Sequence, residues 1–214
     1  METEVRFYYS IESKDKIIDY FKSFNELTYK GRFYECTDQY NHPMEEYDFY
    51  SKNIDGRFRV RKTIGDNVSK CMITWKRRLK DNDRELIHKE EEIEVSIKIE
   101  EYDNLCLLLE SVLHLELVES YERYRSIFSN DEIEIAVDEY PFGLCIEIEN
   151  KSDTKDATEV IKQWLDKLKF DINKACRLSW DDKYNELCKE QKKEVQSIVR
   201  FNMDMPKVSD KFKL

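Results

Sequence analysis

The chain has 214 residues, of which 40% are hydrophobic and 38% are charged, and no apolar run approaches the roughly 18 residues that a membrane span requires. Only 4 residues are glycine and 3 are proline, which excludes low-complexity and collagen-like chains and indicates long regular elements. The net charge of −10 disfavours a broad surface for duplex nucleic acid, because such a surface is normally basic.

The hydrophobic patterning predicts strands and helices in a mixed order. Residues 2–9 alternate as in a strand, and apolar residues at helical spacing predict a helix over 13–24. Period-two segments then predict strands at 31–40, 45–52, 56–63, 70–79 and 84–99, with turn-like breaks at 41–43, 55–56, 65–67 and 81–83. A helix at 101–114, strands at 117–128, 131–140 and 144–150, and helices at 155–169 and 181–199 complete the order, and the last dozen residues are expected to fray.

These elements predict an α+β fold in which about eight strands, joined by hairpin-type connections, pair mostly antiparallel. The main domain is predicted to span residues 1–184, followed by a charged helix and tail at 185–214. The helices have apolar faces, and the apolar faces of the strands are their only large partner. We therefore expect the helices to pack outside the sheet.

Most predicted strands carry one charged face, because alternate residues of a strand point to the same side. One such strand is most simply a solvated face. Here, however, acids gather on some strands and bases on others, which predicts that the charged faces line the lumen of a closed barrel. The charged groups are Glu2, Glu4 and Arg6; Arg57, Arg59 and Arg61; Lys76 and Arg78; Glu90, Glu92 and Glu94; Arg123 and Arg125; Glu134 and Asp138; and Glu147 and Glu149.

A lumen of this kind suits one class of chemistry. Unpaired charges would lose hydration inside a barrel, so the lumen is expected to hold water, metal ions and a polyanion. Guanidinium groups bind phosphate oxygens in pairs, and clustered carboxylates suit Mg²⁺ or Mn²⁺. Acids and bases together therefore indicate metal-assisted phosphoryl transfer.

The strands also carry an ordered set of short motifs. These are Glu2-x-Glu4-x-Arg6, FRVR at 58–61, TWK at 74–76, ExE at 92–94, RYR at 123–125, a lone Asp138 and EIE at 147–149. In this order they resemble the CYTH superfamily, also called the triphosphate tunnel metalloenzymes. DEYPFGLCIEIEN at 138–150 is the most specific part, and SWDDKY at 179–184 resembles a pattern near the family's C-terminus. The resemblance implies an eight-stranded antiparallel β-barrel, the triphosphate tunnel, with helices packed outside.

The resemblance also implies roles for single residues. It implies that Mg²⁺ or Mn²⁺ is bound by Glu2, Glu4, Glu147 and Glu149, and that Glu92, Glu94 and Asp138 are catalytic. The residues implied to bind phosphate are Arg6, Arg57, Arg59, Arg61, Lys76, Arg78, Arg123 and Arg125. Arg6 stands where the family's ExExK motif has lysine, which looks more like the capping-type RNA triphosphatases and leaves the substrate class open.

The function that the resemblance implies is metal-dependent hydrolysis of the terminal phosphate of a triphosphate. Tripolyphosphate, a nucleoside or thiamine triphosphate and the 5′-triphosphate end of RNA remain candidate substrates. A class IV-type adenylate cyclase, a non-catalytic module that binds polyphosphate or nucleotide, and a subunit of a viral RNA-capping system remain as alternatives.

The expected setting is a reducing one. The six cysteines form no CxxC pair and the three histidines form no HExxH motif, which disfavours zinc sites and favours the cytoplasm, or a viral or nuclear location if the chain belongs to a capping system. We expect no membrane partner and no broad duplex binding, and a homodimer stays open.

Overall fold

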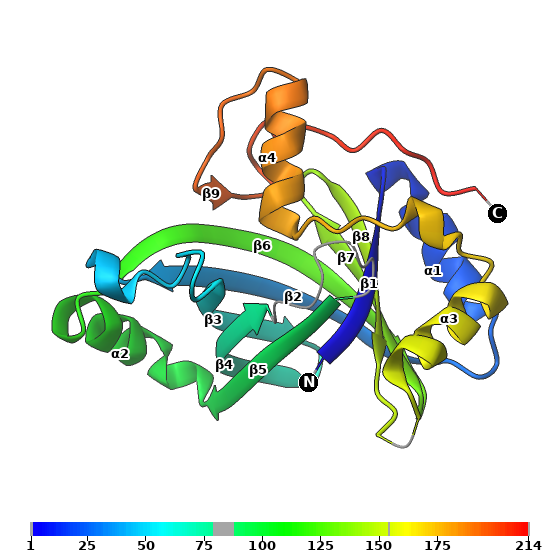
Figure 1. The fold of residues 1–214 in the computed structure, drawn as a ribbon, viewed down its shortest axis with the longest axis horizontal. Helices are drawn as coiled ribbons and strands as arrows, with labels where there is room; N and C mark the ends of the chain where they lie inside the picture. Colours follow the sequence, from blue (N-terminus) through cyan, green and yellow to red (C-terminus); the bar gives the residue numbers. More distant parts are fainter. Residues whose placement is uncertain (1, 79–87, 154, 214) are drawn as a thin grey trace.

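A ring of long strands dominates the computed structural model, which describes residues 2–78, 88–153 and 155–213 (Figure 1). The strands in this described part are β1 (Glu2–Tyr9), β2 (Thr28–Asn41), β3 (Gly56–Gly65), β4 (Val68–Arg78), β5 (His88–Ile97), β6 (Glu116–Ser129), β7 (Ile133–Tyr140), β8 (Gly143–Asn150) and β9 (Ile198–Val199). The α-helices there are α1 (Lys14–Lys22), α2 (Tyr102–Leu107), which continues as a π-turn over Leu108–Val112, α3 (Ala157–Lys167) and α4 (Trp180–Glu190). In the described part of the chain, no helix has the length and apolar character needed to cross a membrane.

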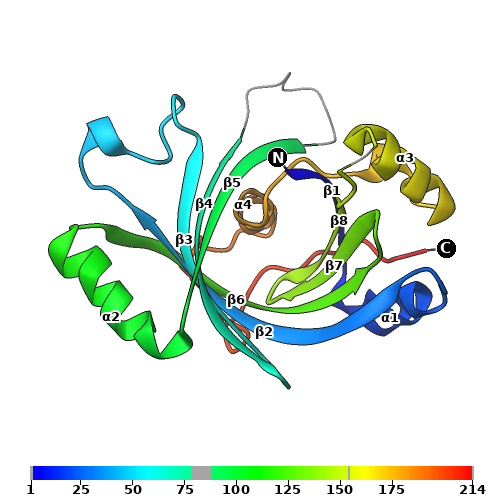
Figure 2. The same ribbon diagram turned by 90° about the horizontal axis from the view of Figure 1, so that it is seen from below.

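The antiparallel pairings of β1–β8 return on themselves. Neighbours follow the order β2-β3-β4-β5-β1-β8-β7-β6, and β6 pairs back onto β2 along the whole length of β2, as the view through the ring shows (Figure 2). The weakest junction joins β1 and β5, which pair only over Glu2–Glu4 and His88–Glu90, so the wall is open beyond these residues. The expected eight-stranded antiparallel tunnel is confirmed, with this one opening.

Alternation along the strands places apolar side chains outside the ring and charged ones inside. On β8, Ile146 and Ile148 are fully buried on the outer side, where α1 and α3 cover them. Glu147 and Glu149 point the other way. α2 covers a second apolar cluster around Tyr40, and α4 with the C-terminal segment covers a third. α1, α2 and α3 therefore pack outside the sheet, as the sequence predicts. α4 differs, because its cluster includes Tyr8, Tyr121 and Cys145, which point to the inner side, so this helix closes one end of the ring (Figure 2).

Residues 45–52 do not form the strand that their alternation predicts. They contain a single 3₁₀ turn, Glu45–Tyr47, followed by a loop. The side chain of Asn41 accepts hydrogen bonds from the backbone of His42 and Phe49, and Asp48 accepts one from Tyr50. These side chains replace the partners that a neighbouring strand would supply, and so hold a loop in place of a strand. The predicted break at 81–83 lies outside the described residues.

The C-terminal segment also differs from its prediction. The expected helix over 181–199 ends at Glu190, the proposed boundary at residue 184 falls inside α4, and β9 then pairs parallel with β6 at Ser120 and Tyr121. The last described residues, up to 213, do not fray, since Val208 and Phe212 are buried and the Val208 N–H donates to the Phe142 carbonyl over 2.8 Å. The apolar residues of this extended segment are irregularly spaced, so they match neither the helical period of 3.6 residues nor the strand period of two, and the sequence does not predict that they are buried.

Candidate functional site

The inside of the ring encloses a cavity of about 300 Å³, which we call the tunnel cavity. It has the size of a site for one small ligand. Its lining includes twelve of the fifteen residues to which the resemblance assigns a role: Glu4, Arg6, Arg57, Arg59, Arg61, Lys76, Glu92, Glu94, Arg123, Arg125, Glu147 and Glu149. Glu134 of β7, which the alternation also places inside, lines the cavity as well. Parity along the strands therefore brings the predicted acids and bases to one place.

Three of the predicted residues do not appear in that lining. The side chains of Glu2 and Arg78 lie outside the described part of the structure. Asp138 has no exposed surface and lies behind two arginines instead of at the cavity surface. The catalytic role implied for Asp138 is therefore not matched by its position, because the residue has no access to a ligand in the tunnel cavity.

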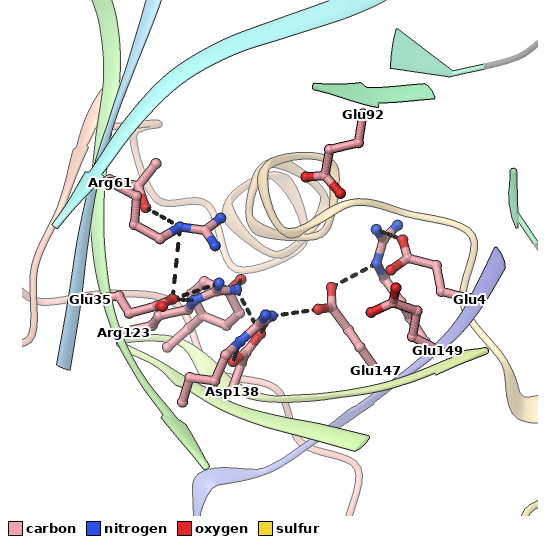
Figure 3. A network of polar contacts seen from close by, with 12 residues as sticks. Glu4, Glu35, Arg61, Glu92, Arg123, Asp138, Glu147 and Glu149 are labelled. Atoms are coloured by element: carbon pink, nitrogen blue, oxygen red, sulfur yellow. Dashed lines mark hydrogen bonds and ion pairs between the residues drawn. The ribbon is translucent and has the colours of Figure 1, made fainter. Parts of the chain in front are cut away.

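Asp138 joins Arg123 and Arg125 into one rigid unit (Figure 3). Its Oδ2 accepts a hydrogen bond from Arg123 Nη1 over 2.7 Å, and Arg125 donates to both of its oxygens, over 2.7 and 2.6 Å. Glu35 on β2 holds Arg123 from the other side, with Nε–Oε2 at 2.7 Å. Bidentate pairing of this kind fixes the planes of the guanidinium groups as well as their positions.

The same chain of ion pairs continues to β8 and β1. Arg125 donates to Glu147 over 2.6 Å, Glu147 accepts from Arg6 Nε over 2.9 Å, and Arg6 also contacts Glu4 (Figure 3). Burial favours the neutral form of Glu147, but Arg125 and Arg6 outweigh it and hold the pKa of this carboxyl well below its ordinary value. Glu147 therefore remains ionised at neutral pH and keeps both arginines in place.

The wall formed by β3 carries an excess of positive charge. Arg59 contacts Glu92 over 3.3 Å, and Arg61 donates to the Thr37 hydroxyl over 3.2 Å. Burial and the charge of neighbouring Arg59 lower the pKa of Arg61. On this wall, the buried atom Arg59 Nε has no hydrogen-bond partner among the described residues, and the same is true of Arg6 Nη1 on β1. Buried donors without partners are costly, so this wall is suited to an anion with several oxygens.

The N-terminal turn of α4 stands over one end of the tunnel cavity (Figures 1 and 2). Trp180 packs against Tyr121 with ring centres 4.0 Å apart. Asp181 lies 3.9 Å from the guanidinium group of Arg57, which is itself stacked on the Tyr50 ring at 4.5 Å. α4 and β3 are thus joined across this end by a charged contact.

Glu119 on β6 belongs to the same end of the ring. It accepts a hydrogen bond from the Gln39 amide over 2.6 Å. Burial, together with the nearby carboxylate of Asp181, raises the pKa of Glu119 to about 7. This carboxyl therefore changes its charge near neutral pH, unlike Glu147.

The carboxylates fit a divalent cation in donor type and in strand position. Glu4 and Glu149 are directly opposite residues of β1 and β8, and Glu147 is the next residue on the same face. Carboxylate oxygens are the donors that Mg²⁺ prefers. Among the described residues, no three acidic, cysteine or histidine side chains lie close enough together to form a metal site, and Glu4 and Glu147 both form ion pairs with arginine.

The sequence reasoning missed Glu35 and Tyr121. Glu35 is buried between Arg123 and Arg61, and Tyr121 lines the cavity. Both residues have the inward parity of their strands. In the pairing of β2 with β6, Glu35 lies opposite Arg123, and Tyr121 lies opposite Thr37. That parity is the signal that could have identified them.

Comparison with known proteins identifies the fold. No family model matches the chain, and no curated protein matches it. Among solved structures, PH1819 from Pyrococcus horikoshii OT3 matches with a TM-score of 0.65 and 21% identity over 87% of this chain and 99% of the other. A proposed adenylate cyclase from Vibrio parahaemolyticus matches with a TM-score of 0.58 and 16% identity, over 83% and 94% of the two chains.

A third solved structure is HpAC1 from Hippeastrum, a proposed adenylyl cyclase described as having a dominant triphosphatase activity. It matches with a TM-score of 0.58 and 15% identity, over 91% of this chain and 98% of the other. The chain therefore shares its fold with these proteins, which confirms the fold that the CYTH resemblance implies.

Proposed function

We propose that the chain is a metal-dependent hydrolase that removes the terminal phosphate of a triphosphate held in the tunnel cavity. The observation that carries this proposal is the set of five buried or half-buried arginines that converge on the cavity from β1, β3 and β6: Arg6, Arg59, Arg61, Arg123 and Arg125. Rigid guanidinium groups in a site of low water content bind the oxygens of a phosphate chain strongly.

The arginines would do most of the work on the phosphates. Arg123 and Arg125 are held in fixed orientations by Asp138, so they can receive phosphate oxygens without reorganisation. Arg59 and Arg61 on the facing wall would neutralise the charge of the same chain of phosphates. The named activity of HpAC1 supports this reading.

A divalent cation, Mg²⁺ or Mn²⁺, would be held by Glu4, Glu147 and Glu149, with Glu2 as a further candidate. When bound, it would supply charge neutralisation and a more acidic water molecule. Glu92 and Glu94, which line the opposite side of the cavity, are the candidates for orienting the attacking water. Asp138 would position arginines and would not contact the substrate.

A product assay tests the proposal. Purified protein is incubated with tripolyphosphate, ATP, thiamine triphosphate or a 5′-triphosphate RNA, in Mg²⁺, Mn²⁺ or chelator. We expect orthophosphate release that needs metal, and Arg59→Ala is expected to lower kcat/KM about 10- to 100-fold, since a charged hydrogen bond contributes about 1.5–3 kcal/mol. Arg32→Ala is the matched control, because Arg32 pairs with Glu139 on the outer surface. Full activity of Arg59→Ala would contradict the site.

The second candidate is an adenylate cyclase, which the Vibrio match favours by its description. The same assay separates the two, because a cyclase converts ATP to pyrophosphate and cyclic AMP. Tight binding of all four compounds without any product would instead identify a module that binds polyphosphate or nucleotide.

A further inference from the structure

β5 has an open edge. Its first three residues pair with β1, but from Glu91 to Ile97 no described residue pairs with β5 on the side away from β4. Figure 1 shows β5 running away from β1 toward α2. The residues from Ile93 to Ser96 are all exposed, on both faces of the strand. Alternate residues of this stretch therefore direct their N–H and C=O groups into solvent.

The outer face of this edge is apolar. Ile93 and Val95 are 57% and 52% exposed, and Ile97 packs against Tyr102 and Leu105 of the α2 cluster. Natural proteins usually protect an edge strand with charge, proline or a covering element, because an open apolar edge pairs readily with another strand. On the outer face, such a charge is present only at the start of the open stretch, where Glu91 pairs with Arg77, and among the described residues none protects it from Ile93 to Ile97.

We propose that this edge binds a second copy of the chain, with β5 of each copy paired antiparallel about a two-fold axis through Val95. In such a pair, each residue faces the residue that lies as far beyond Val95 in the second copy as it lies before Val95 in the first. Ile93 then faces Ile97 of the second copy, and Val95 faces the Val95 of that copy. On the other face, Glu92 meets Lys98 and Glu94 meets Ser96 of the second copy. Lys98 has extended backbone, so the pairing can include it.

The charges exclude two neighbouring registers. Moving the two-fold axis to Glu94 would place Glu94 opposite its own equivalent, and moving it to Ile93 would place Glu92 opposite Glu94. Like charges directly opposite each other destabilise a strand pair, whereas opposite charges stabilise it. The axis through Val95 avoids both clashes and makes two Glu–Lys pairs. It also extends the apolar strip of Ile93, Val95 and Ile97 across the interface toward α2 of both copies. An axis through Ser96 would also avoid like charges, by placing Glu94 opposite Lys98, but Ser96 would then face its own equivalent, so changes at Ser96 separate that register from the one proposed.

The size of the protein in solution tests this proposal. Sedimentation is measured from micromolar to hundreds of micromolar protein at physiological salt, because the charge of −10 makes two copies repel. We expect the apparent mass to rise with concentration from 26.0 kDa toward twice that value. A mass of one chain at every concentration would overturn the proposal.

Matched changes at Ser96 test the register. Ser96 is exposed and lies outside the tunnel cavity. Ser96→Lys creates two pairs with Glu94 of the other copy and is expected to tighten dimerisation about tenfold, while Ser96→Glu creates two repulsions and is expected to weaken it by a similar factor. Equal dimerisation of both variants, or the reverse order, would show that β5 does not pair in this way.

A disulfide gives an independent test. Opposite residues in an antiparallel pair have Cα atoms about 4.5–5.5 Å apart, which suits a disulfide. Val95→Cys is therefore expected to crosslink two copies on mild oxidation. The unsubstituted chain controls for crosslinking through the natural cysteines. In Ile93→Cys the two new cysteines lie far apart in this register, so this variant should form no more crosslinked dimer than the unsubstituted chain. Equal crosslinking of Ile93→Cys and Val95→Cys would overturn the register.

Discussion

Asp138 is a buried residue that acts on the tunnel cavity through the arginines that it holds. It has no exposed surface, yet its two oxygens accept hydrogen bonds from two arginines that line the tunnel cavity. A carboxylate of this kind fixes its partners before a ligand arrives, which removes the cost of orienting them later.

Removing the charge of Asp138 should therefore affect stability and activity together. Asp138→Asn leaves Arg123 and Arg125 buried without their shared anion, and we expect the free energy of unfolding in urea to fall by about 3 kcal/mol. Glu149→Gln is the matched control, since Glu149 lies at the cavity surface beside the half-exposed Lys151. We expect it to lose activity but less than about 1 kcal/mol of stability. Equal stability of the two variants would show that Asp138 is not structural.

For single residues, the alternation along each strand predicts which side chains point into the ring. It selects thirteen residues that line the cavity, Glu134 included, because a strand's alternation is a local property. It cannot separate a residue at the cavity surface from one buried behind its neighbours, as with Asp138, since that depends on the lengths and directions of side chains from adjacent strands. Glu35 has the inward parity of its strand, but parity alone does not reveal its ion pair with Arg123, which lies 88 residues away in the sequence.

Among the elements, the C-terminal segment acts as a strap that packs with α4 at one end of the ring through Met205 and Val208, and reaches the outer cluster of α1 and α3 through Phe212. The Phe212 N–H donates to the Ser13 hydroxyl over 3.0 Å, and its ring meets Tyr9 and Phe170 at 5.3 and 5.7 Å. Extended segments of this kind show no periodic pattern, so their docking depends on pockets that only the folded ring creates. The loop at 45–52 is the opposite case, in which side chains override a clear alternation.

The strap should contribute measurably to stability. Phe212→Ala removes a buried ring, and we expect it to lower the free energy of unfolding by about 3 kcal/mol, the lower end of the range for buried aromatic residues. Lys211→Ala, next to it, removes an exposed ion pair with Glu12 and should leave the stability almost unchanged. If thermal unfolding finds both variants equal to the unsubstituted protein, the segment does not dock in solution.

For the whole molecule, the dependence of stability on pH is set by buried carboxyl groups whose pKa values are shifted in opposite directions. Arg125 and Arg6 hold the pKa of Glu147 well below its ordinary value despite its burial. The pKa of Glu35 is lowered in the same way by Arg123 and Arg61. The stability from these two groups is present above the unfolded pKa of about 4.3 and is lost as the pH falls through their folded values.

Glu119 acts in the opposite direction, because burial and Asp181 raise its pKa to about 7. Between about pH 4.3 and pH 7 the folded state keeps a proton here that the unfolded chain has lost, so stability falls as the pH rises through this window. We therefore expect the unfolding temperature to be highest near pH 5 and to decline toward about pH 7.

Glu119→Gln keeps the acceptor for Gln39 but cannot ionise, and it should flatten that decline while leaving the loss of stability at acid pH unchanged. Thermal unfolding of both proteins across this range is the measurement, and an unchanged decline in Glu119→Gln would assign the effect to another group.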